Sequence, residues 1–560
     1  VQIYSFSSEE DNVTNKQLIR GNVTSLTSEH IDIKLTYPQN SKLLSKNHYA
    51  IEHDSTDGPS NQQYRNLFAF LTATSARKDL LLGRREPEVD KQISLLGSYP
   101  ETVEQIILQA KQAKDYYLLI GPPGTGKTNL ALKSMVQEYL LTAEAANRNC
   151  ETYYHDNALL ITAYTNRAVD EICSMLDNLS QSMSFDYLRI GSEQTTAAVH
   201  HSHLLSVRAH NLPNRKVALS MIQNIPIIVG TVVSLTNAQI IFNKKRFHTA
   251  IIDEASQLLE PQILGLLSAK VNGENAIQKF VLIGDHKQLP AVVQLPENQT
   301  MVEVKELHQI GLFNLRNSLF ERLHWLEKNH DRSNFVGLLN HQGRMHSDIA
   351  QFVNAKFYDG KLCVVPLPHQ IEKLDWQHTD NIYEQFVAQT RIGFVRIAQL
   401  KNTDNLCVNI PEASAITKII EAICTLHSKN ALENFEPAKQ IGIIVPFRSQ
   451  ISAIRNSLRK QGLACADTIT IDTVECYQGS QRDYILYSTT ISEPYQVHII
   501  SNLQEIDGNI VDRKLNVALT RARKQLFIFG NPEILRHSPL YSDLMSYCRH
   551  LDMMSTSLIE

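Results

Sequence analysis

Residues 121–128 read Gly121-Pro-Pro-Gly-Thr-Gly-Lys127-Thr128, and they match the phosphate-loop pattern G-x-x-x-x-G-K-[ST] at every position. The glycines allow backbone N–H groups to turn toward phosphate oxygens, the lysine places a positive charge at the β- and γ-phosphates, and the threonine hydroxyl can bind Mg²⁺. Residues 116–120 are an apolar run typical of a buried strand, and apolar residues recur at helical spacing after the loop. Phosphate would therefore meet the N-terminus of a helix, where the dipole favours an anion. The stretch predicts a nucleoside triphosphate site made by Gly121, Gly124, Thr125, Gly126, Lys127 and Thr128.

The composition is that of an ordinary globular protein. The chain has 560 residues, enough for about three to four domains, of which 43% are hydrophobic and 20% are charged. Its net charge is −4, from 54 Lys and Arg against 58 Asp and Glu, so any nucleic-acid site must be a local groove. The 8 cysteines show no C-x-x-C spacing, which argues against a zinc site or a disulfide framework and for reduced thiols in a cytosolic protein. No apolar run reaches the roughly 18–20 residues that span a membrane, and no signal peptide opens the chain, so we expect no membrane association.

The spacing of apolar runs predicts an α/β protein built from several domains. Short alternating runs in residues 1–60 indicate a small β-barrel, and residues 61–100 are expected to form stalk helices. Apolar strands that each lead to a polar motif and a helix then recur, which is typical of doubly wound domains with a parallel sheet. We predict two such domains in tandem, residues 101–300 and 301–560, with a helical insertion at about 180–223 in the first.

Polar residues follow two of the predicted strands in the first domain. Asp253 and Glu254 come after two isoleucines, and together with the phosphate loop they predict an Mg²⁺ ligand and a base for the attacking water. Gln288 follows the next strand, where its amide could sense the γ-phosphate of a bound nucleotide. A polar turn that ends in Pro290 is the alternative for this second motif.

Two arginines in the second half stand near the expected boundary between the domains. Arg344 lies in the stretch Gln342-Gly-Arg-Met345, and Arg521 follows Leu515-Asn-Val-Ala-Leu-Thr520. Phosphoryl transfer spreads negative charge over equatorial oxygens, which a planar guanidinium stabilises well. Arginines supplied by the second domain would make hydrolysis depend on domain closure, whereas the alternative for either one is an ordinary surface charge.

A series of motifs in the same order resembles that of superfamily 1 helicases of the 5′→3′ branch. The motifs are Gly121–Thr128, Thr162–Asp170, Gly230–Ser234, Asp253–Gln257, Gly284–Pro290, Gln342–His346, Asp472–Gly479 and Arg513–Arg523. The resemblance implies two tandem RecA-like domains. The forms Asp-Glu-Ala-Ser-Gln and Gln-x-Arg-Met-His are similar to the group that contains the nonsense-mediated-decay helicase and the nuclease-helicase of Okazaki-fragment processing.

The N-terminal 100 residues resemble the barrel-and-stalk region of that nuclease-helicase. The resemblance is carried by the predicted barrel and by Ile51–Asp54, Tyr64–Phe68 and Leu81–Arg84. In that family a nuclease domain with cysteine iron–sulfur ligands lies upstream of the motor. Since Val1 falls inside a predicted strand, we expect a fragment of a longer protein in which such a domain precedes this chain.

The resemblance also implies roles for residues at matching positions. Lys127 and Thr128 would bind phosphate and Mg²⁺, and Asp253 would be a second Mg²⁺ ligand. Glu254 would be the catalytic base, and Gln288 would sense the γ-phosphate. The implied cofactors are therefore ATP and Mg²⁺.

Further roles extend from the nucleotide to the strand. Arg344 and Arg521 would be the arginine fingers. Gln105 would read the adenine edge, and Gly479 would contact the nucleotide. Three threonines would touch the backbone of a single strand: Thr165, Thr231 and Thr473.

One departure from the family pattern concerns the base. The family usually has Gln-Tyr-Arg-Met, and Gly343 replaces the tyrosine that packs against the base. The alternative is that a neighbouring ring, such as Tyr358 or Phe357, restores the stacking. With that exception, we predict an ATP-driven 5′→3′ helicase on single-stranded nucleic acid, with DNA favoured over RNA, in replication, repair or nucleic-acid processing. An RNA helicase, or an ATP-gated clamp that does not unwind, are the alternatives. Such a protein would act in the cytoplasm (nucleoid) of a prokaryote or the nucleus of a eukaryote.

Overall fold

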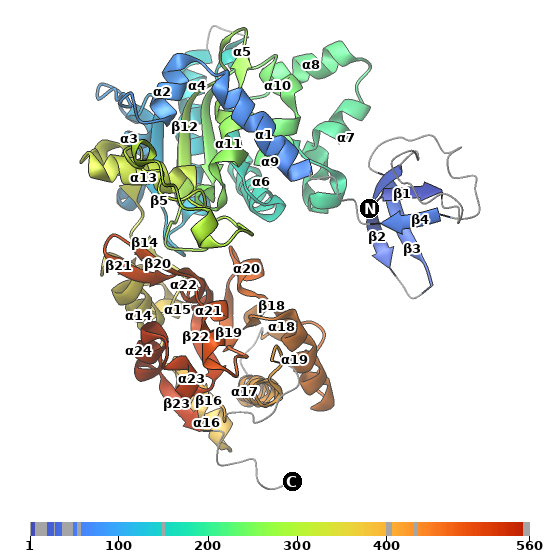
Figure 1. The fold of residues 1–560 in the computed structure, drawn as a ribbon, viewed down its shortest axis with the longest axis vertical. Coiled ribbons are helices and arrows are strands. Elements are labelled where there is room, and N and C mark those ends of the chain that lie inside the picture. Colours follow the sequence, from blue (N-terminus) through green and yellow to red (C-terminus); the bar gives the residue numbers. More distant parts are fainter. Residues whose placement is uncertain are drawn as a thin grey trace. The chain divides into compact units, whose positions relative to one another are not determined.

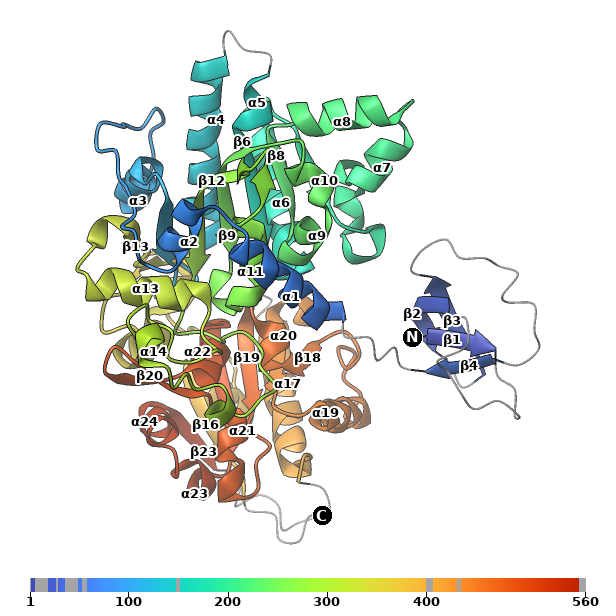
Figure 2. The same ribbon diagram turned by 45° about the horizontal axis from the view of Figure 1, so that its top comes forward.

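The computed structural model describes residues 2–5, 19–26, 29–35, 49–52, 58–147, 152–398, 406–430 and 435–552. They fall into two compact units, residues 1–65 and 66–560. The larger unit contains two large parallel sheets flanked by helices (Figures 1 and 2). Among the helices of these described ranges, none is long and apolar enough to cross a lipid bilayer.

The smaller unit contains an antiparallel sheet of four strands in the order β3-β2-β1-β4. The strands are β1 Gln2–Ser5, β2 Ile19–Leu26, β3 Ile31–Leu35 and β4 Tyr49–Glu52. Ile3, Tyr4 and Ile19 are buried, and the Tyr4 hydroxyl donates to Glu52 Oε1 at 2.5 Å. Among the described strands β3 and β4 each pair with one neighbour, and closure of the predicted barrel stays a prediction.

The first domain of the larger unit is built on seven parallel strands in the order β13-β5-β12-β9-β6-β8-β7. They are β5 Tyr116–Ile120, β6 Ala158–Ala163, β7 Tyr187–Ile190, β8 Ile227–Thr231, β9 Phe247–Asp253, β12 Ile277–Gly284 and β13 Val336–Leu338. The main helices are α3 Glu101–Gln112, α4 Lys133–Asn147, α6 Asn166–Ser180, α8 Arg215–Asn224, α9 Val232–Asn237, α11 Glu260–Leu267 and α13 Leu319–Asn329. Every residue of β6 is buried, because helices cover both faces of the sheet. The predicted doubly wound parallel sheet is confirmed.

The structure places two limits of this domain differently from the sequence prediction. Strand β13 pairs with β5, and α13 packs into the same core, so the domain runs to about residue 339 and not to 300. A strand of three residues is too short to show a periodic pattern. The stretch 180–223, predicted as a helical insertion, contains β7, which extends the sheet by pairing with β8. Its four residues have all their side chains buried, so no alternation of apolar and polar residues marks it as an edge strand.

The second domain has six parallel strands in the order β18-β17-β19-β22-β16-β23. They are β16 Ile392–Arg396, β17 Ile441–Val445, β18 Thr470–Thr473, β19 Arg482–Ser488, β22 Ala522–Gly530 and β23 Arg549–Asp552. The main helices are α14 Ser347–Phe357, α16 Ile382–Ala388, α17 Ile410–Lys429, α19 Arg448–Lys460, α20 Val474–Tyr477, α22 Arg513–Leu519 and α24 Pro539–Tyr547. A hairpin of β20 Leu503–Ile506 and β21 Asn509–Asp512 precedes α22.

The segment predicted as stalk helices contains α1 Gly58–Leu71 and α2 Ser75–Leu81. The Asn66 side-chain amide donates to the Pro261 carbonyl at 2.9 Å, and Arg77 Nη2 donates to the Gln278 carbonyl at 3.1 Å. These bonds attach both helices to the first domain.

Candidate nucleotide-binding site

The phosphate loop joins β5 to a helix, as the sequence predicts. Lys127–Leu132 form a π-helical turn that continues into α4. Gly124 and Gly126 have φ angles of +75° and +82°, which glycine adopts without steric conflict. A Cβ added at Gly121 would lie 2.2 Å from Lys127 Cγ, so the lysine side chain folds over a glycine. The shape of the loop therefore depends on all three glycines.

Strand order brings the acidic motifs beside this loop. Strand β12 pairs with β5, with Gly284 opposite Ile120, and β9 pairs with the other side of β12. The carboxyl ends of parallel strands meet at one edge of a sheet, which places Asp253 and Asp285 next to the loop. Thr128 Oγ1 donates to Asp253 Oδ2 at 3.0 Å.

Asp253 and Thr128 provide oxygen ligands of the kind that Mg²⁺ prefers. Asp253 is buried, and burial together with the nearby Glu254 charge raises the pKa of its carboxyl to about 6. A carboxylate and a hydroxyl are hard donors, so the pair fits a magnesium ion. These two residues would hold the ion beside the phosphate loop, where it would offset negative charge on the phosphates.

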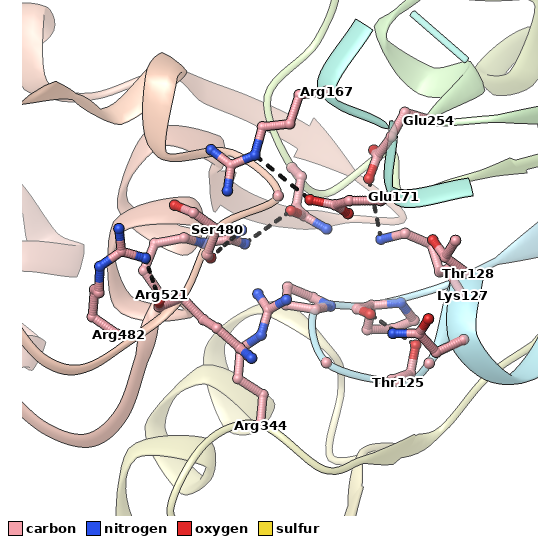
Figure 3. A pocket seen from close by; sticks show the side chains of 18 of the residues that line it. Thr125, Lys127, Thr128, Arg167, Glu171, Glu254, Arg344, Ser480, Arg482 and Arg521 are labelled. Carbon is pink, nitrogen blue, oxygen red and sulfur yellow. Dashed lines mark hydrogen bonds and ion pairs between the residues drawn. The ribbon is translucent and has the colours of Figure 1, made fainter. Parts of the chain in front are cut away.

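Glu254 is held in a backbone conformation that is uncommon for a residue with a side chain. Its φ angle is +53°. Gln257 Nε2 donates to Glu254 Oε2 at 3.0 Å, and Lys127 Nζ lies 3.7 Å from Oε1. The carboxylate faces the cavity beside the loop, in position to accept a proton from water (Figure 3).

A cavity of about 460 Å³ lies between the two domains and collects most of the predicted nucleotide residues. The predicted residues that line it are Gly124, Thr125, Gly126, Lys127, Thr128, Glu254, Gln288, Arg344, Gly479 and Arg521. Gly121 and Asp253 lie beneath this set, against Lys127 and Thr128. The site is therefore assembled from both domains.

Arg344 and Arg521 reach this cavity from the second domain without a carboxylate partner. Arg521 is 1% exposed, and its guanidinium donates to the Val517 carbonyl, Gln288 Oε1 and Thr520 Oγ1. Arg344 Nη1 donates to the Thr520 carbonyl at 3.4 Å. Among the described residues, the oxygens that accept these hydrogen bonds from Arg344 and Arg521 are all neutral.

Two positive charges are thus enclosed beside the phosphate loop. Burial lowers the pKa of Arg344 to about 10. Burial, followed by repulsion from Arg344, lowers the pKa of Arg521 to about 9. The Glu171, Glu254 and Asp285 carboxylates attract these arginines but make no direct ion pair with them, so the guanidinium groups remain available to an anion bound in the cleft.

Comparison with known proteins relates this chain to helicases. Residues 100–218 and 206–295 match one family model and residues 315–533 match a second, and each is described as an AAA domain. The DNA replication ATP-dependent helicase/nuclease JHS1 of Arabidopsis thaliana is 30% identical over 79% of this chain and 29% of its own length. The DNA replication ATP-dependent helicase/nuclease DNA2 of Xenopus laevis is 28% identical over 78% of this chain and 38% of its length. Helicase sen1 of Schizosaccharomyces pombe is 29% identical over 62% of this chain and 18% of its length.

The chain belongs to the superfamily 1 helicases. It spans between 18% and 38% of the length of these three relatives. The two matched regions together cover most of both parallel-sheet domains, and the second match begins at residue 315 within the first domain, so the helicase relationship rests on the part of the chain that holds the nucleotide cavity.

One face of helix α6 lines the cavity and was not predicted. Arg167, Glu171 and Ser174 stand three and four residues apart, so they share one side of the helix. Arg167 Nε lies 3.5 Å from Glu171 Oε1, and burial raises the pKa of Glu171. Their helical spacing after Thr165 is the sequence signal that could have identified these three residues.

Gln105 and the three strand-contact threonines lie outside the cavity. Gln105 is exposed on α3 and is not among the lining residues. Thr165 and Thr231 are N-cap residues whose side chains accept from Ala168 N and Ser234 N, and Thr473 is the N-cap residue of α20. Adenine recognition by Gln105 and strand contact by the threonines stay predictions.

Two aromatic residues could replace the missing tyrosine, but both make other contacts. Phe357 is buried in the core of the second domain, and the Tyr358 hydroxyl donates to Asp285 Oδ2 at 2.7 Å. Neither lines the nucleotide cavity. Neither residue therefore supplies an aromatic face in place of the tyrosine that Gly343 replaces.

Proposed function

We propose that this chain is an ATP-dependent helicase that moves 5′→3′ along single-stranded nucleic acid, with DNA as the favoured strand. The observation that carries the proposal is the pair Arg344 and Arg521, which come from the second domain and face the phosphate loop of the first without a direct hydrogen bond or ion pair to a carboxylate of the described residues. A triphosphate in the cavity would offer negative charge to both arginines and pull both domains toward it.

The residues of the first domain have distinct tasks in this proposal. Lys127 and the loop N–H groups bind the phosphates, and Thr128 and Asp253 hold Mg²⁺, which neutralises phosphate charge when bound. Glu254 accepts a proton from the attacking water. Gln288, which accepts a hydrogen bond from Arg521, reports the γ-phosphate to the second domain.

Movement along a strand follows from alternating grip by the two domains. Thr165 and Thr231 contact the strand backbone from the first domain and Thr473 from the second, so each cycle of closure and opening shifts the strand. Backbone contacts supply most of the affinity and give little sequence preference. Such an enzyme works where nucleic acid is held, in a nucleoid or a nucleus.

DNA is favoured because the predicted barrel and stalk resemble the DNA nuclease-helicase, and two of the relatives above are named for DNA replication. A second candidate, an RNA helicase, is favoured by the similarity to Regulator of nonsense transcripts 1 of Dictyostelium discoideum, which is 26% identical over 78% of this chain.

One set of assays tests the proposal. ATP hydrolysis is measured without a strand and with matched DNA and RNA oligonucleotides, and strand displacement is measured on forked duplexes with a single 5′ or 3′ tail. The proposal expects strong stimulation, greater with DNA, and displacement only with the 5′ tail. Stimulation without displacement supports a clamp, greater stimulation by RNA supports the second candidate, and displacement only with a 3′ tail overturns the direction.

A further inference from the structure

The carboxylate of Asp285 is the meeting point of a buried hydrogen-bond chain between the two domains. Asp285 follows β12 in the first domain and is 1% exposed. Its Oδ2 accepts from Tyr358 Oη and from Gln288 Nε2, each at 2.7 Å, and its Oδ1 accepts from Lys287 N at 3.0 Å. All these donors are neutral, so a buried charge depends on each of them.

Tyr358 brings the second domain into this chain. It follows α14, and the residue is 5% exposed. A carboxylate can only accept, so the Tyr358 hydroxyl donates to Asp285, and its oxygen accepts from Asn516 Nδ2 at 2.9 Å. Burial and the Asp285 charge raise the pKa of Tyr358, so the hydroxyl keeps its proton.

The same carboxylate determines which way the Gln288 amide points. Because Gln288 Nε2 faces Asp285, the amide oxygen faces Arg521, whose Nη2 donates to it at 3.2 Å. A reversed amide would set two oxygens against each other and two N–H groups against a guanidinium. The second N–H of the Gln288 amide remains for a group in the cavity, which Gln288 lines.

One helix of the second domain, α14, connects one residue that lines the cavity and one that contacts Asp285. Arg344 lies just before α14, and Tyr358 lies just after it. A movement of α14 would therefore shift two groups at once: Arg344 in the cavity, and the Tyr358 hydroxyl that donates to Asp285.

We propose that Tyr358 is a positioning residue for ATP hydrolysis, acting through Asp285 on the amide of Gln288. The proposal rests on the function proposed above, in which Gln288 faces the γ-phosphate. Tyr358 itself does not line the cavity, and although it also accepts from Asn516, its proposed route to the cavity runs through Asp285 and Gln288.

The test is Tyr358→Phe, which removes one hydroxyl and keeps the ring. Tyr541→Phe is the matched control, because Tyr541 is a buried tyrosine of the same core whose hydroxyl lies 2.9 Å from that of Tyr487. We expect Tyr358→Phe to lower strand-stimulated kcat by about tenfold or more, as for a hydrogen bond to a charged group, with KM for ATP changed less than about twofold. Its Tm should be no lower than that of Tyr541→Phe, whose kcat should be unchanged.

A double-mutant cycle separates positioning from general loss of structure. In a Gln288→Ala background, adding Tyr358→Phe should lower kcat by less than about twofold, because the residue through which Tyr358 acts is already gone. An equal loss in both backgrounds, or a wild-type kcat for Tyr358→Phe, overturns the proposal. Lys127→Ala is run in parallel: if it hydrolyses ATP normally, the proposed function fails, whereas an inactive Lys127→Ala with a fully active Tyr358→Phe refutes only the positioning role.

Discussion

Gly343 donates its backbone N–H to the carbonyl oxygen of Gly124 across a distance of 2.9 Å. The bond joins the phosphate loop of the first domain to the segment of the second domain that carries Arg344. The contact is close, because a Cβ added at Gly124 would lie 2.4 Å from Arg344 Cβ. The arginine is therefore placed against the loop by backbone approach as well as by charge.

This approach predicts that Gly124→Ala impairs hydrolysis. The new methyl group would collide with Arg344 Cβ, and alanine is disfavoured at a φ of +75°. We expect kcat/KM for ATP to fall by about tenfold or more, since a small displacement of a phosphate contact is costly in catalysis. Gly462→Ala is the control, because Gly462 has a φ of +73° but no atom within 4 Å of the added Cβ. Equal activities of the two variants would refute the steric argument.

Lys127→Ala should abolish ATP hydrolysis and leave strand binding largely intact. Lys127 Nζ donates to the Gly121 carbonyl at 2.9 Å and faces Glu254, so its removal takes away the main positive charge inside the loop. Hydrolysis and binding of a fluorescent oligonucleotide are measured on the same preparation. Lys114→Ala, at an exposed position before β5, should behave as wild type. Normal turnover by Lys127→Ala would refute the assignment of the phosphate loop.

Arg344→Ala and Arg521→Ala should each lower kcat by roughly 10³ or more. Their effect on ATP affinity should be smaller than that of Lys127→Ala, because these arginines stabilise charge that develops in the transition state. Single-turnover hydrolysis and nucleotide binding separate the two quantities. Arg536→Ala removes a surface arginine of the same domain that pairs with Glu533, and it should have no effect. If removal of either arginine leaves turnover unchanged, that residue does not act as an arginine finger.

The nucleotide site is largely readable from sequence because its parts are short and local. The phosphate loop, Asp253 with Glu254, and Gln288 each follow one apolar strand, and parallel strands must end at a common edge. The two arginines stand out by their place near the expected domain boundary, and the motif resemblance then implies their role as arginine fingers. Their lack of an acidic partner is a tertiary fact that no spacing reveals.

The remaining features depend on tertiary contacts or on very short elements. Strand β13 has three residues, and its place beside β5 extends the first domain beyond the predicted limit. Tyr358 was considered only as a possible stacking residue, whereas the fold places its hydroxyl on Asp285, 73 positions away. A hydrogen bond between domains leaves no periodic signal in the chain.

Single strands should stimulate hydrolysis in a salt-dependent way. The net charge of −4 gives no general attraction to nucleic acid, so binding must come from local phosphate contacts that release counterions. We expect the oligonucleotide concentration for half-maximal stimulation to rise by about tenfold or more between 50 and 200 mM salt. The rate without a strand serves as the control and should change little. A stimulation constant that does not depend on salt would contradict backbone binding.

Gly343 predicts loose selection of the nucleotide base. An aromatic face stacked on a base contributes roughly 1–3 kcal/mol, and glycine provides no such face. Phe357 and Tyr358 do not line the cavity, so they cannot restore it without leaving buried positions. GTP and CTP should therefore be hydrolysed with kcat/KM within about tenfold of that for ATP.

Substitution at Gly343 tests this argument directly. A Cβ added there meets only Leu367 Cδ1 at 3.2 Å, so a side chain can be introduced with a small shift of that leucine. Gly343→Tyr should increase the preference for ATP over GTP and CTP, because it returns a ring to the position that packs against the base in the family. Gly343→Ala is the matched control, since it adds the Cβ without the ring and should leave selection loose. The measurement is kcat/KM for the four triphosphates with all three proteins. A wild-type preference for ATP above about a hundredfold, unchanged by Gly343→Tyr, would mean that another part of the cavity holds the base.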